Sequence, residues 1–300
     1  MISVVIISHN REPAVLERAV NSVLNQSYHD VEIIVVNDSS ADFEKYDMVR
    51  KMINDYQMRF NNIFYIEHPK PSGACAARNT GLERAVGEYV AFLDDDDEWD
   101  EDKLAKQLKK FDSVKNPDLA LVSCGFCFVY DGEDGRESLY QGDQYRGNVL
   151  EKLLEDNFIY GASFPLMRTD AVRELGGFDV RFPSCQDWEL WLRIAQKWEV
   201  DYCNEPLVRY HVHGGEQITK SRTNQIRGLE LLIEKNKKNY TLYPKAYAAI
   251  LKRLLYQYAI DRNIKKSLSI ISSISELRQD SIPTLLMLYV RIFKWYICQK

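Results

Sequence analysis

Short apolar runs alternate with amphipathic stretches along the first hundred residues of the chain. Each run has the length of a buried strand, and each stretch between two runs repeats its apolar residues with a helical period, as Val15, Ala19 and Val23 do. Strands and helices that alternate in this way form a parallel sheet with right-handed crossovers. The expected strands are residues 3–7, 32–36, 63–66 and 89–93, and the expected helices are residues 13–26, residues 43–59 and the small-residue stretch after Gly73.

The second half of the chain has a less regular pattern. Two further strands are expected at residues 119–130 and 164–167, one helix ends at Gly176-Gly177, and another begins near Cys185. The end of the chain is helical, with helices expected at residues 224–238, 246–260, 265–277 and 282–296. We therefore predict an α/β fold with a mostly parallel sheet flanked by helices over residues 1–215, followed by a helical C-terminal extension over residues 216–300.

The strand at residues 89–93 stops at four consecutive carboxylates, Asp94 to Asp97. Like charges this close repel one another, so a cation is expected to neutralise them. Oxygen ligands suit Mg²⁺ or Mn²⁺, which keep positions open for water and substrate phosphates. The alternative is a solvated acidic turn before a helix. The loops after Ile7, Val36 and Leu93 all leave the carboxyl ends of strands, where open α/β sheets bind their ligands.

The loop that ends at Gly73 leads into a helix whose free N–H groups favour an anionic ligand. Arg78, early on that helix, can present a planar fork to a diphosphate. The alternative for Arg78 is an ordinary surface cation.

The composition is typical of a soluble globular protein, because 45% of the 300 residues are apolar and 28% are charged. The first residues enter a strand pattern directly instead of a secretory signal, so we expect a cytoplasmic protein. The six cysteines lie in apolar contexts. Cys124 and Cys127 form a C-x-x-C within an expected strand, where residues three apart face opposite sides, so reduced core thiols are favoured over a zinc or redox site.

The net charge of −5 combines an acidic body with a basic tail, since residues 216–300 carry 16 Lys and Arg against 6 Asp and Glu. An acidic body disfavours nucleic-acid binding. The helix expected at residues 282–296 is too short and too charged to cross a bilayer, which takes about 20 apolar residues. It can lie in the membrane interface with Arg291 and Lys294 on anionic lipid. The alternative is that the extension packs on the catalytic domain or on a second subunit of a homo-oligomer.

Four segments resemble, in order and spacing, the motifs of inverting family 2 glycosyltransferases, which have the Rossmann-like GT-A fold of nucleotide-diphospho-sugar transferases. The segments are VVIISHNR at residues 4–11, VNDSS at 36–40, GACAARNTGL at 73–82 and FLDDDD at 92–97. The Gly-Gly-Phe-Asp and Asp-Trp elements downstream are similar as well, and the match covers residues 1–215. The resemblance implies metal-dependent, inverting transfer of a hexose or N-acetylhexosamine from a UDP-sugar to a glycan, glycoprotein or lipid-linked acceptor hydroxyl, in bacterial polysaccharide or glycan synthesis.

The resemblance also implies roles for individual residues on the donor side. Asp38 resembles the aspartate that binds uracil, although an Asx turn is its alternative role. Ser8 and Asn10 correspond to the base pocket, where the Ser8-His9 pair replaces a more usual threonine and tyrosine. Arg78 corresponds to the diphosphate arginine, Asp94 lies towards the ribose or sugar, Asp95 occupies the variable middle position, and Asp96 is the ligand of Mn²⁺ or Mg²⁺, with Asp97 as the alternative ligand.

On the acceptor side, Asp187 corresponds to the catalytic base of the family, and Gln186 stands where a glutamate is usual. The alternative role of Asp187 is a helix cap. Similar enzymes place a metal- or diphosphate-binding histidine near Tyr210-His211-Val212-His213. We prefer His213 to His211, and the alternative is a histidine without a role on an exposed loop.

Two other function classes fit the same α/β pattern less well. A nucleotidyltransferase would be expected to open with a glycine-rich, lysine-bearing signature, which the first residues lack. A non-catalytic calcium- or protein-binding module would use the acidic loop, but Trp99 stands where an EF-hand loop from Asp94 needs glycine.

Overall fold

The computed structural model describes residues 1–114, 116–130, 136–140, 142–212, 221–277 and 280–298, with the side chains of residues 293–298 excepted. The chain divides into two compact units. The first comprises Met1–Val149, Phe158–Val180 and Leu190–Gly214, and the second comprises Leu150–Asn157, Arg181–Glu189 and Gly215–Lys300. The second unit therefore includes two short segments that precede the helical C-terminal part of the chain by many residues.

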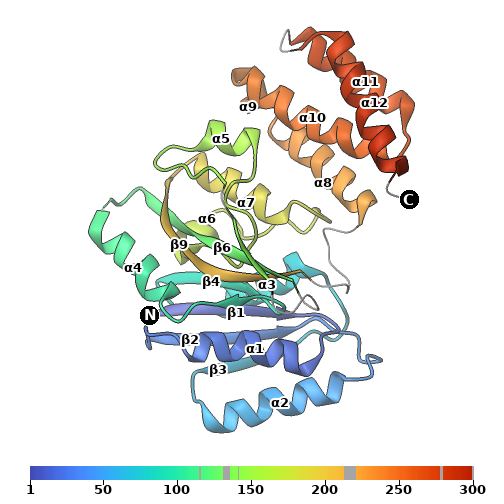
Figure 1. Cartoon of the computed structure of the whole chain (residues 1–300). Helices are drawn as coiled ribbons and strands as arrows, with labels where there is room; N and C mark the ends of the chain where they lie inside the picture. The colour runs from blue at the N-terminus through green and yellow to red at the C-terminus, as the bar shows by residue number, and fades with distance from the viewer. Residues whose placement is uncertain (115, 131–135, 141, 213–220, 278–279, 299–300) are drawn as a thin grey trace. The chain divides into compact units, whose positions relative to one another are not determined.

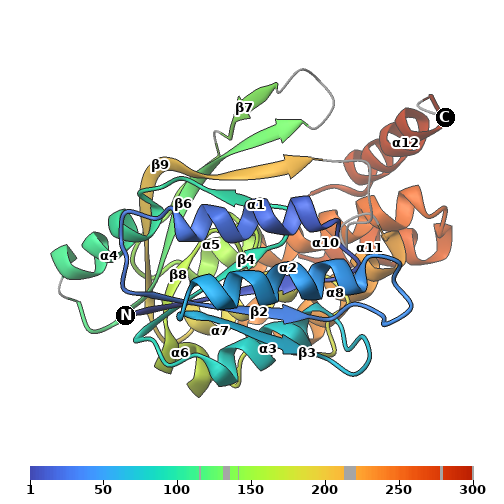
Figure 2. The same ribbon diagram turned by 90° about the horizontal axis from the view of Figure 1, so that it is seen from below.

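A mixed sheet organises the first unit (Figures 1 and 2). The strand order is β3-β2-β1-β4-β8-β6-β9-β5, with β7 beside β6. The first four of these run parallel to one another, whereas β8 is antiparallel to both of its neighbours. The strands are β1 (Ile2–Ser8), β2 (Val31–Asn37), β3 (Ile63–Glu67), β4 (Tyr89–Asp94), β5 (Glu98–Trp99), β6 (Leu119–Tyr130), β7 (Glu137–Leu139), β8 (Leu166–Arg168) and β9 (Glu199–Val212). The predicted α/β fold with a mostly parallel sheet is confirmed.

Helices cover both faces of this sheet. They are α1 (Pro13–Leu24), α2 (Tyr46–Arg59), α3 (Ala74–Arg84), α4 (Lys103–Val114), α6 (Thr169–Glu174) and most of α7 (Gln186–Ala195). Figure 2 shows α1 and α2 side by side on one face. The strand order reverses after β3, so a right-handed crossover places α3 on the other face.

Helix α3 lies very close to the sheet because of Gly81. A Cβ added at this glycine would come within 2.2 Å of Val5 Cγ1 on β1, which is an impossible contact. The small residues of the expected helix therefore allow it to pack closely against β1. The helix carries Arg78 at the edge of the sheet where β1 and β4 end.

The second unit is helical. Its helices are α5 (Leu150–Glu155), the first turn of α7, α8 (Arg222–Lys235), α9 (Lys237–Leu242), α10 (Pro244–Ile260), α11 (Ile264–Glu276) and α12 (Ile282–Cys298). Helix α10 contacts α5, α8, α9, α11 and α12. Its core residues include Leu251 and Leu255, which pack with Ile271, Ile274 and Leu285.

The predicted helix at residues 224–238 is in fact two helices. It is interrupted at the buried Asn236, whose amide donates to the Leu232 carbonyl oxygen at 3.0 Å. Among the residues that the structure describes, no helix has both the length and the apolarity to cross a bilayer.

The cysteines behave as expected of core thiols. The five whose side chains are described form no disulfide with one another, and Cys124 is buried and Cys127 half-buried. Burial raises the pKa of the Cys124 thiol to about 12. No group of three or more histidine, cysteine or carboxylate side chains within the described residues is arranged to hold a metal by itself.

Candidate active site

The carboxyl ends of three strands meet at one edge of the sheet. The register pairs Ile7 of β1 with Asp94 of β4, and Ser8 of β1 with Asn37 of β2. The backbone N–H of Asp38 donates to the Ser8 carbonyl oxygen at 2.8 Å. The loops predicted to converge are therefore adjacent, and Ser8, Asp38 and Asp94 lie beside one another.

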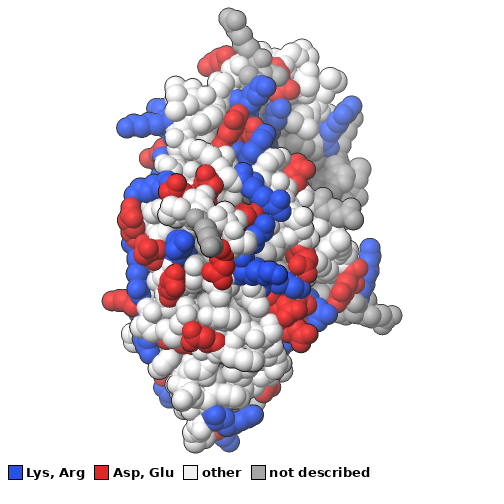
Figure 3. Space-filling model, turned by 90° about the vertical axis from the view of Figure 1, so that its left-hand side faces the viewer, with Lys and Arg blue, Asp and Glu red and all other residues white. Residues whose placement is uncertain are grey.

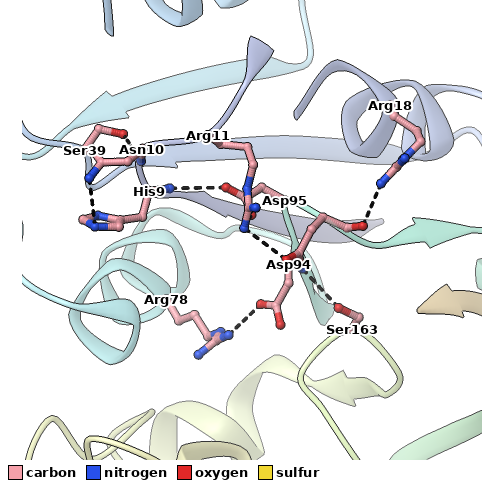
Figure 4. A network of polar contacts seen from close by, with 10 residues as sticks. His9, Asn10, Arg11, Arg18, Ser39, Arg78, Asp94, Asp95 and Ser163 are labelled. Atoms are coloured by element: carbon pink, nitrogen blue, oxygen red, sulfur yellow. Dashed lines mark hydrogen bonds and ion pairs between the residues drawn. The ribbon is translucent and has the colours of Figure 1, made fainter. Parts of the chain in front are cut away.

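Two arginines bind carboxylates of the aspartate turn (Figure 4). Arg11, from the loop after β1, donates through Nε to Asp95 Oδ1 at 2.8 Å and through Nη2 to Asp96 Oδ2 at 3.0 Å. Arg78, from α3, donates to Asp94 Oδ1 at 2.6 Å. The repulsion among the carboxylates is therefore partly neutralised by the protein itself.

The buried carboxylates of the turn have unusual electrostatics. Burial raises the pKa of Asp95 to about 6, against the opposing effect of Arg11. Burial also raises the pKa of Asp97 well above its usual value, reinforced by Asp96 and Asp94. Ser163 and the His211 backbone act in the opposite direction and lower this pKa. The Oδ1 atom of Asp97 has no hydrogen-bond partner within the described part of the chain.

Ser163 is a second support of the turn. Its hydroxyl accepts from the Asp94 backbone N–H at 3.1 Å, and its carbonyl oxygen accepts from Trp99 Nε1 at 2.9 Å. The residue is fully buried. Residues 160–163, which precede the strand expected at residues 164–167, therefore reach the aspartates, a contact that only the fold reveals.

Arg78 itself is fixed by stacking. Its guanidinium lies 5.3 Å from the centre of the Phe178 ring, and only 6% of its side chain is exposed. Arg78 is therefore not an ordinary surface cation, because its guanidinium is buried, stacked on a ring and paired with a carboxylate.

Asp38 organises the loop that precedes α3. Its carboxylate accepts from the backbone N–H groups of Ser72 at 2.7 Å and Gly73 at 2.8 Å. His68 Nδ1 lies 2.7 Å from Asp38 Oδ1, and its Nε2 lies 2.9 Å from Thr80 Oγ1. Because a carboxylate only accepts hydrogen bonds, Nδ1 is the protonated nitrogen. Asp38 and His68 therefore hold the loop that precedes α3, and this contact of His68 had no signal in the sequence pattern.

Ser8 is the last residue of β1, and Asn10 lies in the loop that follows it. Ser8 is 1% exposed, and its Oγ has no hydrogen-bond partner among the described atoms. Asn10 is exposed, adopts a left-handed φ of 48°, and donates from its backbone to Ser39 Oγ at 2.8 Å. His9 connects the same loop to the turn, since its backbone N–H donates to Asp95 Oδ2 at 3.2 Å.

The predicted residues are not all in one unit. Ser8, Asn10, Asp38, Arg78, Asp94, Asp95 and Asp96 belong to the first unit, whereas Asp187 belongs to the second. Asp187 follows Gln186 at the start of α7, and Gln186 donates to the Phe182 carbonyl oxygen at 3.1 Å. His213 lies outside the described residues. His211 is buried on β9, with Nε2 3.7 Å from Glu98 Oε2, and this contact lowers the pKa of Glu98.

The turn suits a divalent cation that completes its coordination outside the protein. Asp94 and Asp96 offer hard oxygen atoms and are only half-buried. Mg²⁺ is commonly held by one or two carboxylates together with waters and substrate phosphates, so two ligands are sufficient. Arg11 occupies one Asp96 oxygen and would share this carboxylate with the ion.

Comparison with known proteins identifies the family of the chain. The family description "Glycosyl transferase family 2" matches residues 3–176. The putative teichuronic acid biosynthesis glycosyltransferase TuaG of Bacillus subtilis (strain 168) is 42% identical over 219 residues, which are 71% of this chain and 79% of TuaG. The putative colanic acid biosynthesis glycosyl transferase WcaA of Escherichia coli (strain K12) is 28% identical over 260 residues, 82% of this chain and 85% of WcaA.

Solved structures show the same fold. Residues 1–349 of S. aureus TarS, in complex with UDP-GlcNAc, superpose with a TM-score of 0.67 at 16% identity, covering 93% of this chain and 80% of that one. The mannosyltransferase PcManGT from Pyrobaculum calidifontis, in complex with GDP-Man and Mn²⁺, gives a TM-score of 0.60 at 18% identity, covering 99% and 83%. With the family match over more than half of its length and a GT-A-like sheet, this chain belongs to glycosyl transferase family 2 and is a glycosyltransferase.

Proposed function

We propose that this glycosyltransferase moves a hexose or N-acetylhexosamine from a UDP-sugar to an acceptor hydroxyl, with inversion at the anomeric carbon and with Mn²⁺ or Mg²⁺ as cofactor. The observation that carries the proposal is the convergence of Ser8, Asp38, Arg78 and the aspartate turn at one sheet edge. The structural neighbours named above bind UDP-GlcNAc or GDP-Man with Mn²⁺, which supports a nucleotide-sugar donor and a divalent ion.

The donor would be held by groups that are already oriented. Asp38 Oδ2 accepts one backbone N–H and retains capacity for a base N–H. The Arg78 guanidinium, fixed by Phe178 and Asp94, is placed to bind diphosphate oxygens. A divalent ion on Asp96 would supply neutralisation of the charge that grows on the leaving diphosphate.

Asp187 is the proposed general base for the acceptor hydroxyl. Direct attack by the deprotonated oxygen displaces the nucleoside diphosphate and inverts the anomeric carbon, so one carboxylate is sufficient, whereas inverting hydrolases use two. Gln186 beside it is neutral, which favours the charged form of Asp187 compared with a neighbouring glutamate.

Donor hydrolysis without acceptor tests this proposal. Purified protein with Mn²⁺ should release UDP slowly from a UDP-sugar and should stop in EDTA, while GDP-sugars react more slowly. Asp96→Asn should abolish the release of UDP that depends on Mn²⁺. Asp187→Asn should lower turnover about 10²- to 10⁴-fold while UDP still binds. Absence of binding to every nucleoside diphosphate would overturn the proposal, and preference for GDP-sugars would replace the donor class.

For the acceptor, we propose a bacterial surface polysaccharide or lipid-linked glycan, made at the cytoplasmic side of the membrane. The names of TuaG and WcaA refer to teichuronic and colanic acid synthesis, which supports a polysaccharide. Transfer of radiolabelled sugar into lipid extracts, compared with soluble oligosaccharides, distinguishes the two acceptor types.

Peripheral membrane contact through α12 is a further proposal, supported by exposed apolar side chains. Leu286, Met287 and Val290 are 39%, 57% and 45% exposed. Charge alone is weaker support, because Lys252 pairs with Asp280 at 2.6 Å and Lys266 with Glu230 at 2.8 Å. On the face drawn in Figure 3, basic and acidic side chains are interspersed.

Flotation with anionic liposomes tests this contact. Wild-type protein should float at low salt, and Met287→Asp together with Val290→Asp should abolish flotation. Thr241→Asp on α9 adds a charge away from this helix and should change little. Wild-type protein that stays at the bottom of the gradient excludes the membrane contact.

A further inference from the structure

The segment that carries Asp187 has an unusual backbone. Cys185, two residues before it, adopts a φ of 60°, a left-handed conformation that L-residues other than Asn and Asp rarely occupy. Such a conformation persists only when the surrounding structure imposes it. The contacts around residues 181–189 therefore decide where the Asp187 carboxylate lies.

Helix α8 supplies the first of these contacts. A Cβ added at Gly228 would lie 2.6 Å from the Ser184 carbonyl oxygen, so this glycine allows α8 to touch the backbone next to Cys185. At the C-terminal end of the same helix, Lys235 Nζ lies 2.5 Å from Glu189 Oε1. The Glu189 side chain is only 1% exposed, which makes this a buried carboxylate with a cation from α8.

Helices α5 and α10 hold the residue that follows Asp187. The indole Nε1 of Trp188 donates to the Leu153 carbonyl oxygen at 2.6 Å. The Arg253 guanidinium of α10 lies 5.5 Å from the centre of the Trp188 ring and pairs with Asp156. The segment is therefore held by three helices of the second unit on both sides of Asp187.

We propose that the helical second unit is the scaffold of the catalytic base, with Lys235 as a positioning residue that acts through Glu189 on the first turn of α7. This inference rests on the proposed function for the role of Asp187. Lys235 does not touch substrate. Its cation fixes a buried carboxylate two residues after Asp187, and a base displaced by about 1 Å can lose about 10²-fold in rate.

Variants at Lys235 and Gly228 test the scaffold. Lys235→Met removes the cation from Glu189, Lys235→Arg keeps it, and Gly228→Ala forces a Cβ against Ser184. Lys238→Met, at an exposed position on α9, is the matched control. We expect Lys235→Met and Gly228→Ala to lower kcat about 10- to 100-fold with the KM for the donor unchanged. Lys235→Arg should restore most of the rate, and Lys238→Met should resemble wild type.

Hydrogen exchange provides a readout that does not need activity. In Lys235→Met, peptides covering residues 181–189 should lose protection, while peptides from β1 and β4 keep theirs. Unchanged protection of residues 181–189 in both Lys235→Met and Gly228→Ala would overturn the scaffold inference. If protection falls as expected but wild-type protein turns over no nucleotide sugar, the scaffold stands and the proposed function fails. A kcat of Lys235→Met equal to wild type, with turnover present, overturns the positioning role of Lys235.

Discussion

Arg11 changes the interpretation of the four consecutive aspartates. Its guanidinium binds both Asp95 and Asp96, so the turn has an internal cation before any metal binds. A divalent ion would then modify an existing charge balance instead of creating one. Because the Arg11 side chain is 20% exposed and that of Asp95 only 7%, the pair is buried enough for its loss to be measurable.

Arg11→Gln should lower the free energy of unfolding by about 3 kcal/mol at pH 8, because it leaves the buried Asp95 charge without its cation. Arg11 holds the pKa of Asp95 down, so in the variant the pKa of Asp95 should rise beyond its wild-type value of about 6. The folded variant then takes up a proton as the pH falls, and the loss should be smaller at pH 5 than at pH 8. Urea titrations at both pH values measure this, with Arg11→Lys as the charge-preserving control. An equal loss at both pH values contradicts the assignment.

Lys103 is a buried cation that the proposed chemistry does not use. It is fully buried, donates to Gln107 Oε1 at 2.9 Å and lies 3.9 Å from the centre of the Trp99 ring. Burial lowers the pKa of Lys103 to about 8. Trp99 in turn binds the Ser163 carbonyl oxygen, so Lys103 supports the packing behind the aspartate turn.

The pH dependence of stability should report Lys103. Its folded pKa of about 8 lies below the ordinary value of 10.5, so between these pH values the unfolded state binds the proton that the folded state has released. The free energy of unfolding of wild type should therefore rise with pH relative to Lys103→Met, by at most about 3 kcal/mol. Guanidinium titrations at pH 8, 9 and 10 give the difference. A difference that does not change with pH would show that Lys103 keeps its proton in the folded state, with no lowering of its pKa.

At the scale of elements, one side chain of α3 fastens the Gly-Gly-Phe-Asp segment. Asn79 Nδ2 donates to the Phe178 carbonyl oxygen and its Oδ1 accepts from the Phe178 N–H, both at 2.8 Å. Phe178 is the ring on which Arg78 stacks. The clamp therefore connects two motifs about a hundred residues apart and orients Arg78 towards the aspartate turn.

Gly177→Ala should break this clamp. The residue has a φ of 71°, and an added Cβ would lie 2.4 Å from Asn79 Oδ1. Gly176→Ala is a matched control, since its φ is 77° but its Cβ would meet nothing within 4 Å. Both variants should lose about 1 kcal/mol from backbone strain, and Gly177→Ala about 1–3 kcal/mol more from the overlap. Chemical denaturation measures both, and equal losses would argue against the clamp.

At the scale of the whole molecule, the second unit is not a terminal appendage. It combines the C-terminal helices with residues 150–157 and 181–189 from the middle of the chain. Leu153 and Leu154 of α5 are fully buried, and Tyr240 donates to the Leu154 carbonyl oxygen at 3.3 Å. The predicted boundary at residue 215 stays a prediction, and the unit that holds Asp187 crosses it.

Truncation should show this dependence. A chain ending at residue 220 loses every helix from α8 onward, so residues 150–157 and 181–189 should become sensitive to limited proteolysis and donor turnover should be lost. A chain ending at residue 280 lacks only α12 and should keep both segments resistant, because the contacts described above come from α5, α8, α9 and α10. Resistance of these segments in the shorter chain would contradict the unit's composition.

The amino-acid sequence by itself determined the alternation of strands and helices, the edge at which the loops meet and the location of the aspartate turn. These features depend on the local period of apolar side chains and on strand polarity, which neighbouring residues encode. Only the tertiary structure decided which cation meets which carboxylate, because Arg11 and Asp95 are 84 positions apart. It also decided that the helical unit includes the Asp187 segment, since packing between distant segments depends on three-dimensional shape that no local pattern records.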